Sequence, residues 1–225
     1  MKYRALTVAR EFGSGGGRIA QIVANRLGWK LLDREIVGEI ARAAHVDSQV
    51  VKHYDERVDS WLRRINEEAI RGVAFASDRR LAESDIFDAR SMTELTRGVI
   101  EEAYATGNCV IVGRGAQCIL EHKLDVFHVF VYAPIRERIE RLKKRLGSCA
   151  DVEQRLREVD GDRARYLHLQ FGRNWCDPHL YDMMLRSTDD EDAAARLIIC
   201  AMTGGENAKI ERSLEPALED AAQVS

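Results

Sequence analysis

The sequence predicts an α/β fold in which a parallel sheet carries helices on both faces. Short apolar segments alternate with segments whose apolar residues recur at helical spacing, a pattern typical of parallel sheets. A glycine cluster separates the first predicted strand from the first predicted helix. The chain has 225 residues, of which 45% are hydrophobic and 32% charged. This length and composition fit one large globular α/β domain.

The first strand, loop and helix are predicted from residues 5–28. Residues 5–9 form a short apolar run that leads into the glycine-rich residues 13–17. The apolar residues that follow recur on one side of a helix ending at Gly28: Ile19, Ile22, Val23 and Leu27. Strand, glycine loop and helix in this order are the context of a phosphate-binding P-loop.

The remaining elements continue the alternation, with two interruptions. Further strands are predicted at residues 29–32, 109–112, 126–132 and 181–185, and helices at 92–106, 135–146 and 193–202. Residues 34–90 contain no convincing strand, and residues 149–178 are polar with five arginines. Both stretches are interpreted as excursions above the carboxyl edge of the sheet, where ligands bind in folds of this class.

The glycine loop is expected to bind the phosphates of a nucleotide through its backbone N–H groups and the following helix N-terminus. The residues expected to do so are Gly13, Ser14, Gly15, Gly16, Gly17 and Arg18. The full pattern GxxxxGK[ST] is absent, since the lysine position falls on Gly16 and the hydroxyl position on Gly17 or Arg18. A tight turn without a ligand is the alternative.

Two nearby arginines could supply the charge of the missing lysine. Arg18 opens the predicted helix, and Arg10 stands just before the loop. Arginine can hold phosphate through two hydrogen bonds, although its geometry differs from that of lysine. Ser14 is the only hydroxyl in the loop; it could bind Mg²⁺ or serve as a turn residue.

Charge and composition exclude several classes of protein. The net charge of −3 argues against a dedicated nucleic-acid-binding domain, which is usually strongly basic. No apolar segment approaches the ~18 residues of a membrane helix, and the N-terminal apolar run is shorter than a signal-peptide core of ~7–15 residues. Five cysteines without close pairing suit reduced thiols. We therefore expect a cytoplasmic protein with no membrane or nucleic-acid partner.

Five segments, in this order, resemble the cytidylate kinase-like family. They are residues 9–17 (AREFGSGGG), 31–36 (LLDREI), 110–114 (VIVGR), 162–166 (DRARY) and 174–177 (NWCD). The resemblance spans residues 4–202. It implies a P-loop NTPase-type core (1–33, 108–148 and 179–202), a helical insertion that binds a nucleoside monophosphate (34–107) and an arginine-rich lid (149–178). Residues 203–225 form an acid-rich tail.

The resemblance also implies an activity, phosphoryl transfer from ATP with Mg²⁺ to CMP or dCMP. Arg114 matches the arginine that holds the acceptor phosphate, and Asp162 and Arg165 match lid residues that contact the acceptor. Asp33 matches the aspartate that closes the second strand; it is expected to be catalytic and is a second candidate for Mg²⁺. We expect Arg163 to bridge the donor and acceptor phosphates, and Arg18 to stabilise the transferring group.

The sequence departs from the family at three positions. Gly115 replaces an aspartate, Glu39 replaces an arginine, and Gly16 stands where the P-loop lysine is expected. Asp33 could also cap the helix that starts at Arg34, and the lid arginines could form a solvated helix face. Two further hypotheses stay open: a kinase for another small acceptor, and a nucleotide-binding regulator without catalysis.

Overall fold

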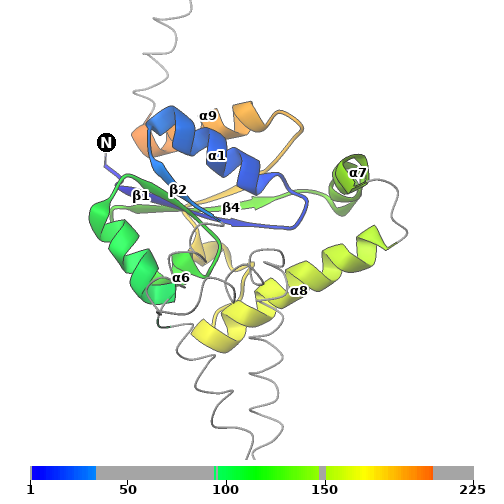
Figure 1. Cartoon of the computed structure of the whole chain (residues 1–225), viewed down its shortest axis with the longest axis horizontal. Coiled ribbons are helices and arrows are strands. Elements are labelled where there is room, and N and C mark those ends of the chain that lie inside the picture. The colour runs from blue at the N-terminus through cyan, green and yellow to red at the C-terminus, as the bar shows by residue number, and fades with distance from the viewer. Residues whose placement is uncertain (1, 34–93, 95, 147–150, 205–225) are drawn as a thin grey trace, which may run out of the picture.

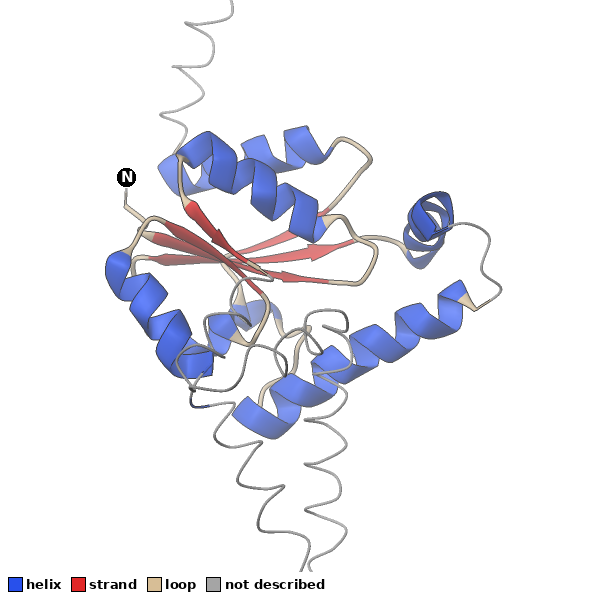
Figure 2. Cartoon of the chain, viewed as in Figure 1, coloured by secondary structure: helices blue, strands red, loops and turns tan. Residues whose placement is uncertain are grey.

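A parallel five-stranded sheet forms the centre of the molecule (Figure 2). The computed structural model describes residues 2–33, 94, 96–146 and 151–204. The strands are β1 (Ala5–Arg10), β2 (Lys30–Leu32), β3 (Cys109–Val112), β4 (Val126–Tyr132) and β5 (Met183–Arg186), in the order β2-β3-β1-β4-β5. Every pairing is parallel. The predicted fold class is confirmed.

Helices cover both faces of the sheet (Figure 1). On one face lie α1 (Gly16–Leu27) and α9 (Glu191–Thr203); on the other lie a helix at residues 96–106, the short α6 (Ala116–Ile119) and α8 (Val152–Phe171). Helix α7 (Ile135–Leu146) follows β4 and leads toward α8, and the 3₁₀ turn η1 (Pro178–Leu180) precedes β5. None of the helices described is long and apolar enough to cross a bilayer.

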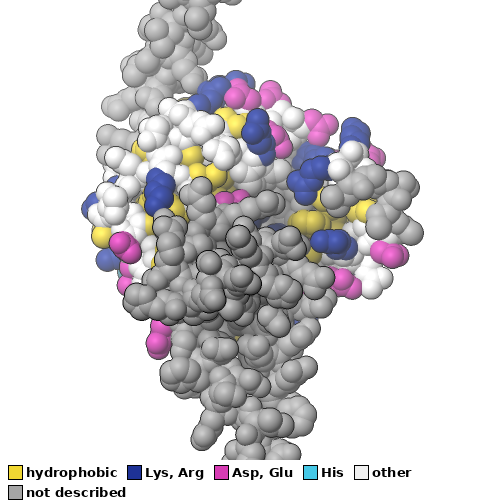
Figure 3. Space-filling view, in the orientation of Figure 1, with side chains coloured by type: hydrophobic (Ala, Val, Ile, Leu, Met, Phe, Trp, Pro, Cys, Tyr) yellow, Lys and Arg dark blue, Asp and Glu magenta, His cyan; other side chains and the backbone are white. Residues whose placement is uncertain are grey.

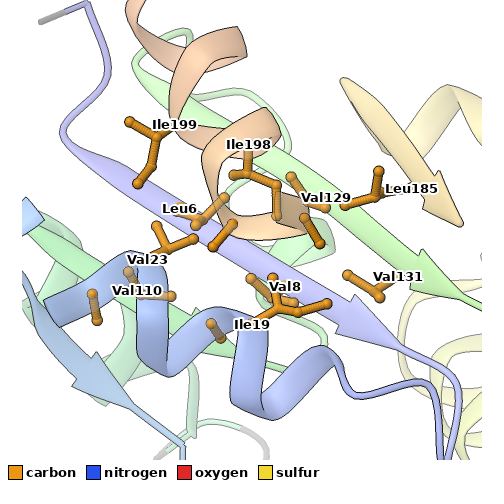
Figure 4. Packing of buried hydrophobic residues seen from close by; sticks show 14 of the residues in the cluster. Leu6, Val8, Ile19, Val23, Val110, Val129, Val131, Leu185, Ile198 and Ile199 are labelled. Carbon is orange, nitrogen blue, oxygen red and sulfur yellow. The ribbon is translucent and has the colours of Figure 1, made fainter. Parts of the chain in front are cut away.

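The largest apolar core lies between the sheet and the helix pair α1 and α9 (Figure 4). Leu6 and Val8 of β1 meet Ile19 and Val23 of α1, and all four are fully buried. Burial of each such side chain stabilises the fold by roughly 1.5–3 kcal/mol. This packing fixes the N-terminus of α1 beside the end of β1, so the glycine loop between them is anchored on both sides.

Three elements differ from the sequence prediction. The last strand begins at Met183 rather than at residue 181, and α9 begins earlier, at Glu191, because Asp190 caps it by accepting a hydrogen bond from the Ala193 amide. Residues 152–171, which the sequence analysis describes only as polar and arginine-rich, form one long helix with an apolar face. The buried residues of this face are Val152, Leu156, Val159, Tyr166 and Leu167. Most of the predicted insertion (34–93) and of the tail (205–225) lies outside the described residues.

Candidate functional site

The candidate site lies where β1, β2 and β3 end. Parallel strands bring their carboxyl ends to one edge, so the residues that follow them meet there. Three predicted groups come together: the glycine loop after β1, Asp33 after β2, and Arg114 after β3. A pocket opens at this edge, lined by Ala9, Arg10, Asp33, Val112, Gly113, Arg114, Gly115, Gln117, Arg163, Tyr166, Leu167 and Trp175.

The glycine loop has the backbone conformation that only glycine adopts readily. Gly13 and Gly15 have φ of 80° and 81°, values in the left-handed region. Within the described part of the chain, no hydrogen bond reaches the amides of Gly13, Gly15 or Gly17. Unpaired N–H groups next to a helix N-terminus are the usual donors to a phosphate. The loop therefore fits the phosphates of a nucleotide.

Ser14 uses its hydroxyl inside the loop. The side chain is fully buried. Its Oγ donates to the Glu11 carbonyl at 2.9 Å and accepts from the Gly16 amide at 3.4 Å. Of the two residues predicted as Mg²⁺ ligands, Ser14 is thus occupied by turn contacts.

Asp33 faces the loop. A Cβ at Gly17 would lie 3.7 Å from its Oδ2, and its side chain is partly exposed. Mg²⁺ bound to a nucleotide usually takes one or two carboxylates, with phosphate and water completing the shell. Asp33 fits this need. Among the described residues, no group of three metal-binding side chains occurs.

The position expected for the P-loop lysine is filled by Arg10. A Cβ at Gly16 would lie 2.5 Å from the Arg10 Cβ and 3.2 Å from the Val131 Cβ. The Arg10 side chain continues past the loop, and its Nη2 lies 3.5 Å from Oδ1 of Asp33. A guanidinium and a carboxylate therefore share the space between the glycine loop and the end of β3.

Arg18 lies outside the pocket. Its side chain is 67% exposed, and its Nε lies 3.9 Å from Oε2 of Glu191. Glu191 also approaches the loop, since a Cβ at Gly15 would lie 2.9 Å from its Oε1. The structure thus places Arg10, rather than Arg18, in the pocket next to the loop.

Arg114 is buried at the end of β3. It is 8% exposed and has φ of 60°, between two glycines that also have positive φ. Burial, with a smaller contribution from the nearby Arg10, lowers the pKa of its guanidinium to about 10, although Tyr166 and Asp33 act in the opposite direction. The group is charged at neutral pH, and a buried cation of this kind gains from an anionic ligand.

Helix α8 contributes Arg163 to the site. Its Nη1 donates to the Arg10 carbonyl at 3.0 Å and lies 3.4 Å from Asp160, which also accepts a hydrogen bond from the Phe12 amide at 2.8 Å. Asp162 and Arg165 do not line the pocket. They pair with each other on α8 at 3.4 Å, and Arg165 is about half exposed.

Several residues that lie in the site are assigned no role there by the sequence analysis. Tyr166, Gln117 and Trp175 line the pocket, and Trp175 also packs edge-on against Phe130 at 5.3 Å between ring centroids. Glu11, Asp160 and the buried Arg138 form an ion-pair cluster below the loop. In the sequence, α7 carries arginines at helical spacing, but this pattern is equally typical of a surface helix, so it did not indicate the cluster.

Basic side chains lie near the glycine loop, with acidic side chains among them. Figure 3 shows several Lys and Arg side chains on this face, around the N-terminal end of α1 and around α7. Close to the loop, Arg18 is paired with Glu191 and Arg141 with Asp189.

Comparison with known proteins identifies relatives of the whole domain. A sequence model of the cytidylate kinase-like family matches residues 5–189. A solved structure of an uncharacterized protein from Eubacterium ventriosum is similar, with a TM-score of 0.63 and 19% identity over 88% of this chain and 98% of that one. No match was found among curated proteins.

Solved shikimate kinases are more distantly similar. The enzyme from Acinetobacter baumannii, in complex with shikimate, gives a TM-score of 0.49 at 14% identity, over 91% of this chain and 95% of that one. The enzyme from Bacteroides thetaiotaomicron gives 0.48 at 14% identity, over 89% and 98%.

Proposed function

The chain belongs to the cytidylate kinase-like family, and from this premise we propose that it transfers a phosphoryl group from ATP to a nucleoside monophosphate. CMP and dCMP are the expected acceptors. One observation carries the proposal. The glycine loop, some of whose amides have no hydrogen-bond partner among the described residues, follows β1, and the buried Arg114 follows the neighbouring strand β3. A donor phosphate and an acceptor phosphate can therefore be held at the same edge.

Each group has a role in such a transfer. Phosphoryl transfer depends on positioning and on positive charge around the transferring group. The amides of Gly13, Gly15 and Gly17 would bind donor phosphates, and Asp33 would bind Mg²⁺, which neutralises phosphate charge. Arg114 would hold the acceptor phosphate. Arg163, which lines the pocket, would approach both phosphates, and Asp162 and Arg165 would contact the acceptor.

In place of the missing lysine, an arginine would supply the positive charge beside the donor phosphates. The sequence favours Arg18 and leaves Arg10 as the alternative. The enclosed position of Arg10 beside Gly16 supports Arg10, because a cation shielded from water acts more strongly on a developing charge. Arg18 would have to leave Glu191 to take this role.

The test is ADP formation from ATP and Mg²⁺ with CMP, dCMP, UMP and AMP as separate acceptors. We expect turnover that depends on the acceptor, and fastest with CMP or dCMP. Turnover only with a different small acceptor would support a kinase activity but reject the proposed preference for CMP or dCMP.

A second candidate function is a nucleotide-binding regulator. Gly16 at the lysine position favours it, because the loop alone offers dipoles but no full positive charge. ATP binding without turnover of any acceptor would support the regulator and reject the kinase.

A further inference from the structure

Two arginines of α7 hold the carbonyl side of the glycine loop. Arg138 Nη1 donates to the Phe12 carbonyl at 3.2 Å, and Arg141 Nη1 donates to the Ser14 carbonyl at 3.4 Å. The two arginines are three residues apart, so they lie on the same side of the helix. They contact alternate carbonyls, those of residues 12 and 14.

The same peptide units carry the amides expected to bind phosphate. In a trans peptide the carbonyl and the following N–H point in opposite directions, and no described peptide bond is cis. A Phe12 carbonyl directed at α7 therefore turns the Gly13 N–H away from α7. The Ser14 carbonyl does the same for the Gly15 N–H. These two amides are among those without a hydrogen bond in the described chain.

The Ser14 carbonyl is held by a second donor. Ser187, which follows β5 and is fully buried, donates from its Oγ to this carbonyl at 2.5 Å. Arg141 in turn donates to the Ser187 Oγ at 3.0 Å and to Asp189 at 3.0 Å. The contacts come from α7 and from the segment before α9, so two separate parts of the chain fix one peptide unit.

We infer that Arg138 and Arg141 are positioning residues, which set the orientation of the phosphate-binding amides from behind the loop. The inference rests on the proposed nucleotide-binding role of this loop. Gly13 and Gly15 are free to rotate in a way that other residues are not. A glycine peptide that is not held would sample orientations in which its carbonyl, rather than its N–H, meets the phosphate. Pre-ordering by the arginines removes that cost from ligand binding.

Arg141 is the residue to test. Arg138 is buried against Glu11 and Asp160, so its removal would take the paired cation from Glu11 and leave Asp160 with Arg163 alone, which would endanger the fold. Arg141 is partly exposed, and Arg141→Met preserves much of its length. Arg136→Met is the matched control, since Arg136 is exposed on the same helix.

The probe is inorganic tripolyphosphate, titrated into the full-length protein by calorimetry, with CMP as a second ligand. Arg141→Met should weaken tripolyphosphate binding by roughly tenfold, the effect expected for a charge-assisted hydrogen bond. Ser187→Ala should weaken it by about threefold. CMP affinity should be unchanged in both variants, and Arg141→Lys should recover part of the loss. Arg136→Met should bind like the wild type.

Three results would overturn the inference. If Arg141→Met binds tripolyphosphate as the wild type does, the arginine does not position the loop, although the loop still binds phosphate. If tripolyphosphate and CMP affinities fall together, the arginine has only a general structural role. If the wild-type protein binds neither tripolyphosphate nor ATP, the nucleotide-binding role of the loop fails, and this inference fails with it.

Discussion

The proposed donor loop and the proposed acceptor side of the pocket are built from different parts of the chain. The donor loop offers backbone N–H groups, and its side chains are either absent or, like Ser14, turned inward. The acceptor side offers the side chains of Arg114, Arg163 and Tyr166. Under the proposed function, donor binding would thus depend on peptide orientation, whereas acceptor binding would depend on the identity of side chains.

On the proposed function, this difference accounts for a donor loop that lacks the P-loop lysine. Amides in a correctly bent loop bind phosphate whichever side chains are present, as long as glycines permit the bend. On the acceptor side, phosphate binding would depend on charged side chains, so a single substitution there removes one charge. The contrast predicts unequal effects of substitutions in the two regions.

The largest effect is expected at Arg10. If its guanidinium replaces the lysine charge, Arg10→Met should lower turnover by about a hundredfold and change ATP affinity far less. Arg18→Met is the comparison, since Arg18 lies on the outer side of the loop. Steady-state kinetics of ADP formation give both values. A larger loss in Arg18→Met would restore the role first predicted for Arg18.

Arg114→Ala should affect the acceptor alone. Loss of one charge-assisted phosphate contact should weaken CMP binding by roughly 1.5–3 kcal/mol, about tenfold to a hundredfold, with little change for ATP. Calorimetric titration with each nucleotide measures this. Arg157→Ala, on the exposed side of α8, is the control. Equal losses for CMP and ATP would show that the two sites are not separate.

Gly16→Ala should distort the glycine loop, because the added methyl group has no room. The added Cβ would lie 2.5 Å from the Arg10 Cβ, so the backbone or Arg10 must shift. Overpacking of this kind lowers the free energy of unfolding by about 1–3 kcal/mol, and ATP affinity should fall as well. In contrast, Gly161→Ala in α8, where a Cβ meets nothing within 4 Å, should raise the free energy of unfolding by about 0.5–1 kcal/mol. Denaturant unfolding of both variants separates these effects.

The smallest effect is expected in α8. Residues 149–178 are predicted to form a lid, and we expect such a lid to be mobile without ligand and protected with it. Because Leu156 packs against Leu142, and Leu167 packs into a cluster with Phe130, we expect a modest gain in amide protection, concentrated at residues 160–167. Hydrogen exchange with and without an ATP analogue and CMP measures it. Equal, strong protection in both states would make α8 a fixed wall of the pocket.

Much of the fold follows from local sequence patterns. The strands β1, β3 and β4 are mostly apolar runs, as is typical of buried parallel strands, and the structure places them where the sequence predicts. Helix α8 was the difficult element, since its arginines lie among apolar residues that only the fold identifies as buried. The early start of α9 depends on a single capping contact from Asp190.

The site was predictable in part. The glycine cluster, Asp33 and Arg114 could be found because each directly follows a predicted strand. The partners of those residues could not. That Arg138 and Arg141 reach the loop, and that Ser187 joins them, depends on how α7 and β5 pack around it, more than a hundred residues away in sequence.

The central claim is that the donor phosphates are held by backbone amides and the acceptor phosphate by a side chain. Two-dimensional ¹H–¹⁵N spectra of the protein, titrated separately with an ATP analogue plus Mg²⁺ and with CMP, test it most directly. We predict that the analogue shifts the amide signals of Gly13, Gly15 and Gly17, and that CMP shifts the Nε signal of Arg114. Glycine amides that do not respond to the analogue, in a protein that binds it, would contradict the account.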